Sequence, residues 1–172
     1  VPTIWNSYLA HLEATGSDSG PLQRVLVGGS ALSTAMVNAF KAHGVRAVHA
    51  LGMTETSPLI VVATPTPGLL AQGAEHAAQV LATRQGRPMF GIELSIRDEQ
   101  GLDLPWDGKS SGVLLLRGPW VVDRYFPDVP ATDDDGWFDT GDIATIDTTG
   151  FLQITDRKKD VIKSGGEWIS SI

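Results

Sequence analysis

The chain has 172 residues, which is enough for one ordinary domain or for parts of two. Hydrophobic residues make up 42% of it and charged residues 19%, proportions that exclude an intrinsically disordered chain. The formal net charge of −7 argues against a nucleic-acid partner or an anionic lipid surface, and no apolar stretch approaches membrane-spanning length. The absence of cysteine excludes disulfides and thiolate metal sites, and it fits a cytoplasmic protein.

The first residues predict a helix followed by a buried strand. Gly16 supplies a stop signal for the helix, and residues 24–27 form a short apolar run typical of a strand. The apolar residues at helical spacing are Ile4, Trp5, Tyr8, Leu9 and Leu12. Because the chain opens directly in this helix, we expect it to be an internal piece of a larger protein.

A second helix and a second strand follow. Ser33 is the expected N-cap of a helix that reaches residue 42, and Gly44 stands just past its end. Residues 45–50 predict the second strand. Strand, helix and strand in this order indicate a parallel α/β unit, in which the loops after the strands hold ligands. We therefore expect an α/β fold, with residues 1–70 as the end of a parallel-sheet subdomain.

The pattern changes after residue 64. An Ala- and Gln-rich segment at residues 70–83 predicts a helix. Short alternating stretches separated by turn residues then predict strands at 92–97, 113–117, 121–125, 143–147 and 151–155. We expect residues 71–156 to form a small antiparallel, β-barrel-like subdomain. The polar residues 156–160 predict either a plain turn, which is the commoner case, or an interdomain hinge. With a hinge there, we expect residues 157–172 to contain it and the start of a further domain.

Two loops in the first half carry groups suited to phosphate. Gly28, Gly29 and Ser30 follow a strand and precede a helix, where free N–H groups can bind an anion. A plain tight turn has the same pattern. Thr54 and Glu55 lie beyond the next strand, where a hydroxyl and a carboxylate can serve phosphate and a divalent cation. A solvated loop with a helix cap is the alternative there.

Asp142 follows a Thr-Gly turn at the start of a predicted strand. An ionised carboxylate in this place can accept hydrogen bonds from both hydroxyls of a ribose. If the hairpin loop has two residues, Asp142 faces Thr155 and lies close to Arg157. A surface ion pair of little consequence is the alternative. A bulge in the hairpin is expected to separate the two groups.

Four motifs stand in order along the chain. They are Gly-Gly-Ser-Ala at 28–31, Gly-Met-Thr-Glu-Thr at 52–56, Gly-Trp-Phe-Asp-Thr-Gly-Asp at 136–142, and Asp-Arg-Lys-Lys-Asp-Val-Ile-Lys-Ser-Gly-Gly-Glu-Trp-Ile-Ser at 156–170. Together they resemble the adenylate-forming superfamily, which includes acyl-CoA synthetases, luciferases and the adenylation domains of peptide synthetases. The last motif is most similar to the fatty-acyl-CoA synthetase branch.

The resemblance implies a two-step ligase reaction in the whole protein. A medium- or long-chain fatty acid reacts with ATP to give an acyl-adenylate and pyrophosphate, and coenzyme A then displaces AMP. Thr54 would bind phosphate or the acyl carboxyl group, and Glu55 would hold Mg²⁺. Asp142 and Arg157 would bind the same ribose, and Lys159 would be the hinge about which a small domain rotates.

The resemblance also implies the remaining contacts. The nucleotide pocket would be lined by Gly28, Gly29, Ser30, Leu51, Gly52, Met53, Thr54 and Ile154, and coenzyme A would approach Gly165, Gly166 and Trp168. The partners are therefore small molecules, namely ATP, a fatty acid and coenzyme A, while a homodimer of the whole protein stays open.

Two departures from the family pattern affect these expectations. Leu51 stands where the family usually has an aromatic residue that stacks on adenine. The family's phosphate loop and its late catalytic lysine are not in this sequence, so we expect the piece to be inactive alone. An aryl-CoA ligase, an amino-acid-activating domain and a non-catalytic protein that keeps the fold remain as alternatives.

Overall fold

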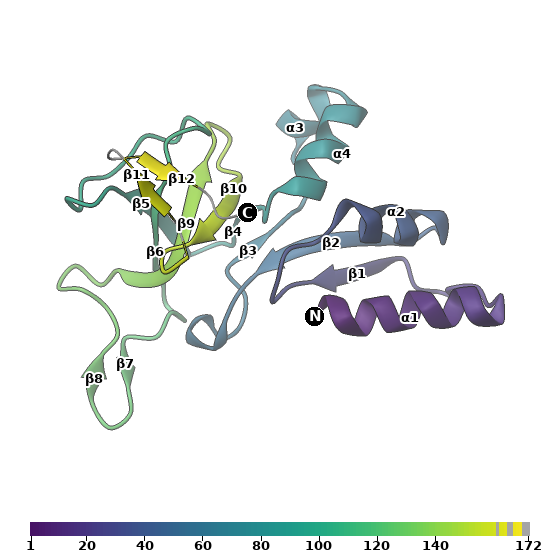
Figure 1. Cartoon of the computed structure of the whole chain (residues 1–172), viewed down its shortest axis with the longest axis horizontal. Helices are drawn as coiled ribbons and strands as arrows, with labels where there is room; N and C mark the ends of the chain where they lie inside the picture. Colours follow the sequence, from purple (N-terminus) through teal and green to yellow (C-terminus); the bar gives the residue numbers. More distant parts are fainter. Residues whose placement is uncertain (161, 165–166, 170–172) are drawn as a thin grey trace.

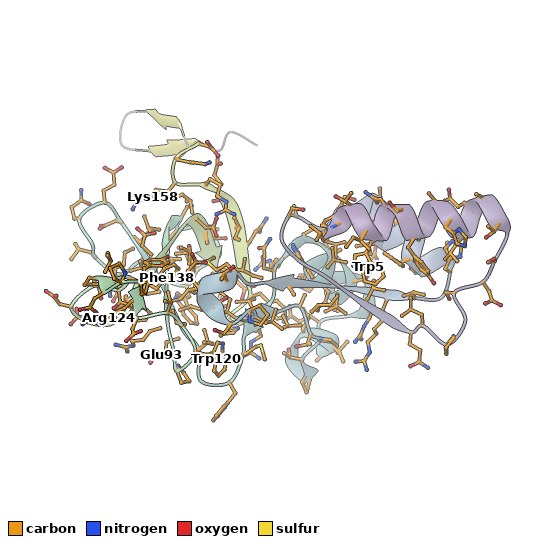
Figure 2. The ribbon with its side chains drawn as sticks, turned by 90° about the horizontal axis from the view of Figure 1, so that it is seen from below. Trp5, Glu93, Trp120, Arg124, Phe138 and Lys158 are labelled. Carbon is orange, nitrogen blue, oxygen red and sulfur yellow. The ribbon has the colours of Figure 1, made fainter. Side chains whose placement is uncertain are left out.

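The first half of the chain builds the expected parallel strand pair. The computed structural model describes residues 1–160 and the backbone of residues 162–164 and 167–169. In it β1 (Arg24–Val27) lies parallel to β2 (Arg46–Leu51), and α2 (Thr34–Ala42) connects them. Figure 1 shows α1 (Pro2–Thr15) and α2 beside this pair, at the end of the molecule where Figure 2 labels Trp5.

The two helices of this half begin and end where the sequence predicts. α1 ends at Gly16, whose φ of 66° no other residue type adopts as easily. Ser33 caps α2, because its hydroxyl oxygen accepts a hydrogen bond from the backbone N–H of Met36. The apolar faces of both helices share one core with β1, formed by Leu9, Val25, Val27, Leu32, Met36, Phe40 and Val45.

Two short strands complete the first sheet. β3 (Val61–Val62) pairs antiparallel with β2, and β4 (Arg87–Pro88) pairs antiparallel with β3, so the order is β1-β2-β3-β4. The loop between β2 and β3 contains a single 3-10 turn, η1 (Thr54–Thr56). The parallel unit therefore continues into a mixed sheet.

The prediction of a single helix over residues 70–83 is wrong in its extent. The structure has α3 (Pro67–Ala71) and α4 (Ala74–Thr83), separated at Gly73. Gly73 has a φ of 106°, which no helical residue can adopt, so the chain turns there. Among the helices of the described residues, none combines the length and apolar character needed to cross a bilayer.

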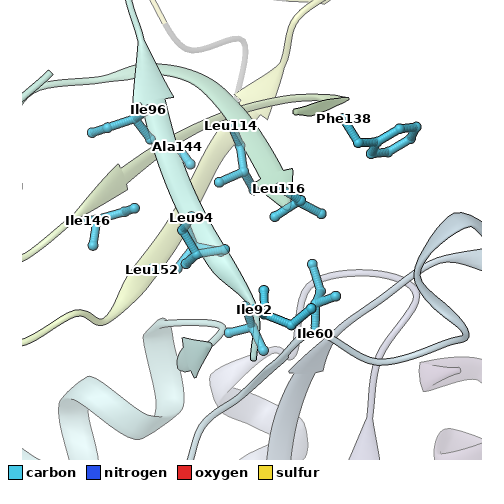
Figure 3. Close-up of a cluster of buried hydrophobic side chains, with 11 residues drawn as sticks. Ile60, Ile92, Leu94, Ile96, Leu114, Leu116, Phe138, Ala144, Ile146 and Leu152 are labelled. Atoms are coloured by element: carbon cyan, nitrogen blue, oxygen red, sulfur yellow. The ribbon is translucent and has the colours of Figure 1, made fainter. Parts of the chain in front are cut away.

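The second half forms an antiparallel sheet, in the order β10-β9-β6-β5. Its strands are β5 (Glu93–Arg97), β6 (Gly112–Arg117), β9 (Phe138–Ile146) and β10 (Leu152–Arg157). One face buries the main core (Figure 3), which consists of Ile60, Val61, Ile92, Leu94, Ile96, Leu114, Leu116, Phe138, Ala144, Ile146 and Leu152. The expected antiparallel architecture is confirmed, but the described residues form no closed barrel.

The strand expected at residues 121–125 is largely absent. Only β7 (Arg124–Tyr125) pairs, with β8 (Val129–Pro130), in a hairpin that projects from the second sheet (Figure 1). The backbone N–H of Val122 donates instead to the carbonyl of Glu55 at 2.8 Å, so this stretch follows the loop after β2.

The register of the hairpin of β9 and β10 differs from the predicted one. Its loop is one residue longer than predicted, because Gly150 takes a left-handed conformation with a φ of 82°. A bulge at Thr155 then shifts the pairing, so that Arg157 lies opposite Asp142. The prediction that Asp142 faces Thr155 is therefore wrong. The bulge brings the two charged residues together, whereas we expected a bulge to separate them.

A short junction ties the two sheets together. The backbone N–H of Gln85 donates to the carbonyl of Leu152, and the N–H of Leu152 donates to the carbonyl of Gly86 at 2.7 Å. The side-chain oxygen of Gln85 accepts from the N–H of Ile154, also at 2.7 Å. The segment that leads into β4 is thereby joined to β10 of the second sheet. The division into subdomains near residues 70 and 156 remains a prediction.

The substitution Gly86→Ala tests this junction. A Cβ atom on Gly86 would lie 2.1 Å from the backbone of Val62, and its φ of 119° is also strained for alanine. Gly101 has a positive φ as well, but nothing lies within 4 Å of a Cβ there. We expect Gly86→Ala to lower the free energy of unfolding by about 3 kcal/mol and Gly101→Ala by about 1 kcal/mol, measured by urea denaturation. Equal losses would show that close packing at Gly86 is unimportant.

Candidate functional site

The principal cavity lies where the two sheets meet. It has a volume of about 790 Å³ and is lined by the end of β2, the loop after β1, and parts of β9 and β10. Of the residues expected at a nucleotide or metal site, it is lined by Gly29, Ser30, Leu51, Gly52, Met53, Glu55, Asp142, Ile154 and Arg157. The cavity therefore gathers side chains that are far apart in the sequence.

Some expected site residues lie just outside the lining. Gly28 packs under the end of β2, where an added Cβ would lie 2.9 Å from the carbonyl oxygen of Ala50. Thr54 is exposed on η1, and Lys159 is exposed in the turn after β10. Gly165 and Gly166 lie outside the described residues, as does the side chain of Trp168, whose backbone belongs to β12 (Glu167–Ile169).

The loop after β2 is held rigidly. Gly52 allows it to fold back, because a Cβ at this position would lie 1.7 Å from the carbonyl oxygen of Pro58. The Thr56 hydroxyl is fully buried and donates towards the carbonyls of Met53 and Pro58, while it accepts from the N–H of Met53. Glu55 is thus presented to the cavity from a loop with a fixed backbone.

Asp142 and Arg157 form the most unusual pair in the cavity. Nη1 of Arg157 lies 2.9 Å from Oδ1 of Asp142, and the Asp142 side chain is 1% exposed whereas that of Arg157 is 57% exposed. Within the described residues neither oxygen of Asp142 accepts a well-oriented hydrogen bond. Buried carboxylate oxygens are normally satisfied, so this pair has two acceptors available for a ligand.

The electrostatic environment of Asp142 is unfavourable for its charge. Burial raises the pKa of this carboxyl above its usual value, the nearby Arg157 lowers it, and the charge of Asp139 raises it again. Thr140 positions the backbone of Asp142, because the Thr140 hydroxyl accepts its N–H and donates to the carbonyl of Leu114. The strand therefore holds a carboxylate in a place that a hydroxyl-rich ligand would stabilise.

The turn after β10 is fixed on the side nearest to the cavity. The backbone N–H of Lys158 donates to the carbonyl of Gly141, and its ammonium group lies 2.7 Å from Asp139. Lys159 follows directly, before the strands β11 (Ile162–Ser164) and β12. The expected hinge residue thus comes immediately after a well-anchored one.

His49 is a cavity residue that the sequence analysis missed. It lies on β2 with 4% of its surface exposed, and its Nδ1 has no hydrogen-bond partner among the described residues. Burial lowers its pKa, while backbone groups of Ser30 and Arg84 raise it, so the imidazole stays neutral at pH 7. A histidine within an apolar strand, three residues before Gly52, was the available signal.

Two more lining residues, Gln85 and Tyr125, were also missed. Gln85 holds β10 through its bond to Ile154, and the Tyr125 hydroxyl donates to Oε1 of Glu55 at 3.1 Å. Partial burial and the Glu55 carboxylate raise the pKa of Tyr125, so its hydroxyl remains a donor. Both contacts join positions far apart in the chain, and no local pattern marks them.

A magnesium ion fits the groups that the chain offers, provided that phosphate supplies further ligands. No group of three or more acidic, histidine or cysteine side chains within the described residues could form a complete metal cage. Within the loop after β2, Glu55 is the residue that brings a carboxylate to the cavity, and the other lining carboxylates belong to β9, β10 and the turn after β10. Mg²⁺ is usually bound by one or two carboxylates together with substrate phosphates and water, which is the arrangement that a lone Glu55 allows.

The family model for AMP-binding enzymes matches residues 1–126. The chain belongs to this family.

Two relatives that are similar to this chain over its whole length are CoA ligases. The chain is 47% identical to a medium-chain-fatty-acid–CoA ligase of Ectopseudomonas oleovorans and 48% identical to a 3-methylmercaptopropionyl-CoA ligase of Ruegeria pomeroyi. Each alignment covers 100% of this chain and 32% of the relative, so the chain spans about a third of the length of these relatives.

Solved structures of other proteins share the fold. O-succinylbenzoate coenzyme A synthetase of Bacillus subtilis, in complex with ATP and magnesium, is 28% identical with a TM-score of 0.74. The alignment covers 98% of this chain and 33% of that one. An amide bond synthetase of Marinactinospora thermotolerans is 29% identical with a TM-score of 0.79, over 99% of this chain and 34% of the other.

The raised pKa of Asp142 predicts how the stability of the fold depends on pH. The folded protein holds the Asp142 proton more tightly than the unfolded chain does, so the stability falls as pH rises from about 4 through the folded pKa. We expect Asp142→Asn to remove this fall, measured by urea denaturation from pH 3.5 to 7.5. Asp134→Asn, at an exposed turn, should keep the wild-type profile. A wild-type profile for Asp142→Asn would contradict the burial argument.

Proposed function

We propose that the whole protein to which this chain contributes is an ATP-dependent fatty-acid–CoA ligase that releases AMP and pyrophosphate. The observation that carries the proposal is the buried Asp142 carboxylate, with two unsatisfied oxygens beside Arg157 in a cavity that also contains Glu55. The family membership supports an adenylating reaction. The names of the relatives at 47% and 41% identity, medium- and long-chain-fatty-acid–CoA ligases, support fatty acids as the substrates.

The ribose of ATP is the part of the ligand that Asp142 would bind. A vicinal diol offers two donors at the spacing of two carboxylate oxygens, and both oxygens of Asp142 lack hydrogen bonds from the described residues. Hydrogen bonds to a charged acceptor are stronger than neutral ones. The guanidinium of Arg157 lowers the pKa of this carboxyl and so offsets part of the effect of burial, and it is itself exposed enough to reach a phosphate.

The base of the nucleotide would lie towards β2. His49 offers a neutral ring with an unpaired Nδ1, and Leu51 offers an aliphatic wall without ring stacking. A hydrogen bond to His49 would satisfy a buried nitrogen that otherwise lacks a partner. His49 therefore compensates in part for the missing aromatic residue at position 51.

The phosphates would lie between Glu55 and the loop at Gly29 and Ser30. Mg²⁺ held by Glu55 would neutralise part of the phosphate charge. Gly29 has a φ of 83°, which turns the backbone between β1 and α2 towards the cavity. Thr54 remains a candidate for a phosphate or acyl carboxyl contact from the exposed side of η1. Lys159 remains the proposed pivot, with coenzyme A approaching the segment that contains Gly165, Gly166 and Trp168.

The reaction class is tested by ATP–pyrophosphate exchange with the full-length protein. We expect exchange that depends on a medium- or long-chain fatty acid such as octanoate or palmitate, followed by acyl-CoA formation when coenzyme A is added. The 172-residue chain alone should show no exchange, since it spans about a third of its relatives. Exchange with amino acids or aryl acids but not with fatty acids would overturn the substrate class.

The substitution Asp142→Ala tests the ribose contact within the full-length protein. Loss of hydrogen bonds to a charged group, at about 1.5–3 kcal/mol each, should raise the KM for ATP at least about tenfold. The KM for the fatty acid should change little, because Asp142 belongs to the proposed ribose site. The exposed Asp134→Ala serves as the control with an equal loss of charge. An unchanged KM for ATP in Asp142→Ala would place the nucleotide elsewhere.

A further inference from the structure

We propose that Tyr125 is a positioning residue for the Glu55 carboxylate, and that it directs one oxygen of this carboxylate to a bound divalent cation. This inference rests on the proposed function, because it takes Glu55 as the residue that holds Mg²⁺. It adds a role for the β7–β8 hairpin, which lies outside both core clusters that flank the cavity.

A single hydrogen bond joins Tyr125 to Glu55. The Tyr125 hydroxyl donates to Oε1 of Glu55 at 3.1 Å across 70 positions of the sequence. Oε2 of Glu55 accepts no hydrogen bond, and no cationic side chain pairs with Glu55, within the described residues. One oxygen is therefore fixed by a neutral donor and the other is left for a cation. Partners that fix ligating carboxylates in this way tune metal sites.

The main chain on either side reinforces this contact. The Val122 N–H donates to the backbone carbonyl of Glu55 at 2.8 Å, and Nε1 of Trp120 donates to the carbonyl of Leu59 at 3.2 Å. Trp120 and Val122 also pack against the main core. The segment from Trp120 to Tyr125 thus runs along the cavity loop and is anchored to the second sheet.

The Glu55 side chain needs such a contact because only its backbone is otherwise fixed. Thr56 and Gly52 determine the path of the loop, but a glutamate side chain keeps substantial rotamer freedom unless something holds its end. The Tyr125 hydroxyl is the group that supplies this restraint. A positioned carboxylate binds a cation with less loss of conformational entropy than a free one.

Core packing does not account for the position of Tyr125. Tyr125 is 44% exposed, and the neighbouring Phe126, in the turn between β7 and β8, is 97% exposed. The hairpin itself projects from the second sheet (Figure 1). The hairpin is stabilised by its own pairing of Tyr125 with Val129 and by an ion pair of Arg124 with Asp128 at 3.1 Å. Removal of the Tyr125 hydroxyl should therefore leave the fold intact.

The test compares Tyr125→Phe with Tyr8→Phe in the full-length protein. Tyr8 lies on α1, remote from the cavity lining, and loses the same hydroxyl. Binding of Mn²⁺ with a non-hydrolysable ATP analogue is measured by electron paramagnetic resonance. We expect Tyr125→Phe to weaken Mn²⁺ binding about tenfold and Tyr8→Phe to leave it unchanged. The Mg²⁺ concentration for half-maximal pyrophosphate exchange should rise to a similar extent, and excess Mg²⁺ should restore the rate.

A double substitution shows whether Tyr125 acts through Glu55. In a Glu55→Gln background, Tyr125→Phe should have no further effect on Mn²⁺ binding. Wild-type Mn²⁺ affinity in Tyr125→Phe, or a higher KM for ATP with unchanged cation dependence, would overturn the inference and leave the ligase proposal standing. Absence of exchange in the unchanged protein would instead overturn the proposed function and this inference together.

Discussion

The arrangement of this protein depends on the hydrogen bonds between residues 85–86 and β10. They join a mixed sheet built around a parallel strand pair to an antiparallel sheet, and the cavity lies where the two meet. Gly86 of this junction also lies so close to the backbone of Val62 in β3 that no side chain would fit there. Together with the contact of Val122 with Glu55, this junction holds the Asp142–Arg157 pair and the loop that contains Glu55 around one cavity.

The sequence predicts the local structure of this chain well, because caps and turns are determined by nearby residues. Ser33 and Gly16 bound their helices as expected, and the strand–helix–strand order indicates the parallel pair. Errors arise where a distant partner decides the outcome. The bulge at Thr155 depends on the pairing with β9, and the path of Val122 depends on the carbonyl of Glu55.

The residues of the candidate site, too, could be predicted only in part from the sequence. Motif resemblance gathers Ser30, Glu55, Asp142 and Arg157, and the structure places all four around one cavity. The motif resemblance gives no indication of His49, Gln85 or Tyr125, because each of these residues reaches the site through contacts across the fold rather than through its neighbours in sequence. The site also combines a buried carboxylate whose pKa is raised with a buried imidazole whose pKa is lowered. Both shifts arise from burial, and a polar ligand would relieve both.

The position of the cavity has a consequence for how the two sheets behave. Its walls come from both of them, so a nucleotide bound there would touch Ser30 and His49 on one side and Asp142 and Arg157 on the other. Such a ligand would hold the two sheets together for as long as it is bound. By thermodynamic linkage, any change that weakens the contact between the two sheets must also weaken binding of the ligand, and binding of the ligand must in return oppose separation of the sheets.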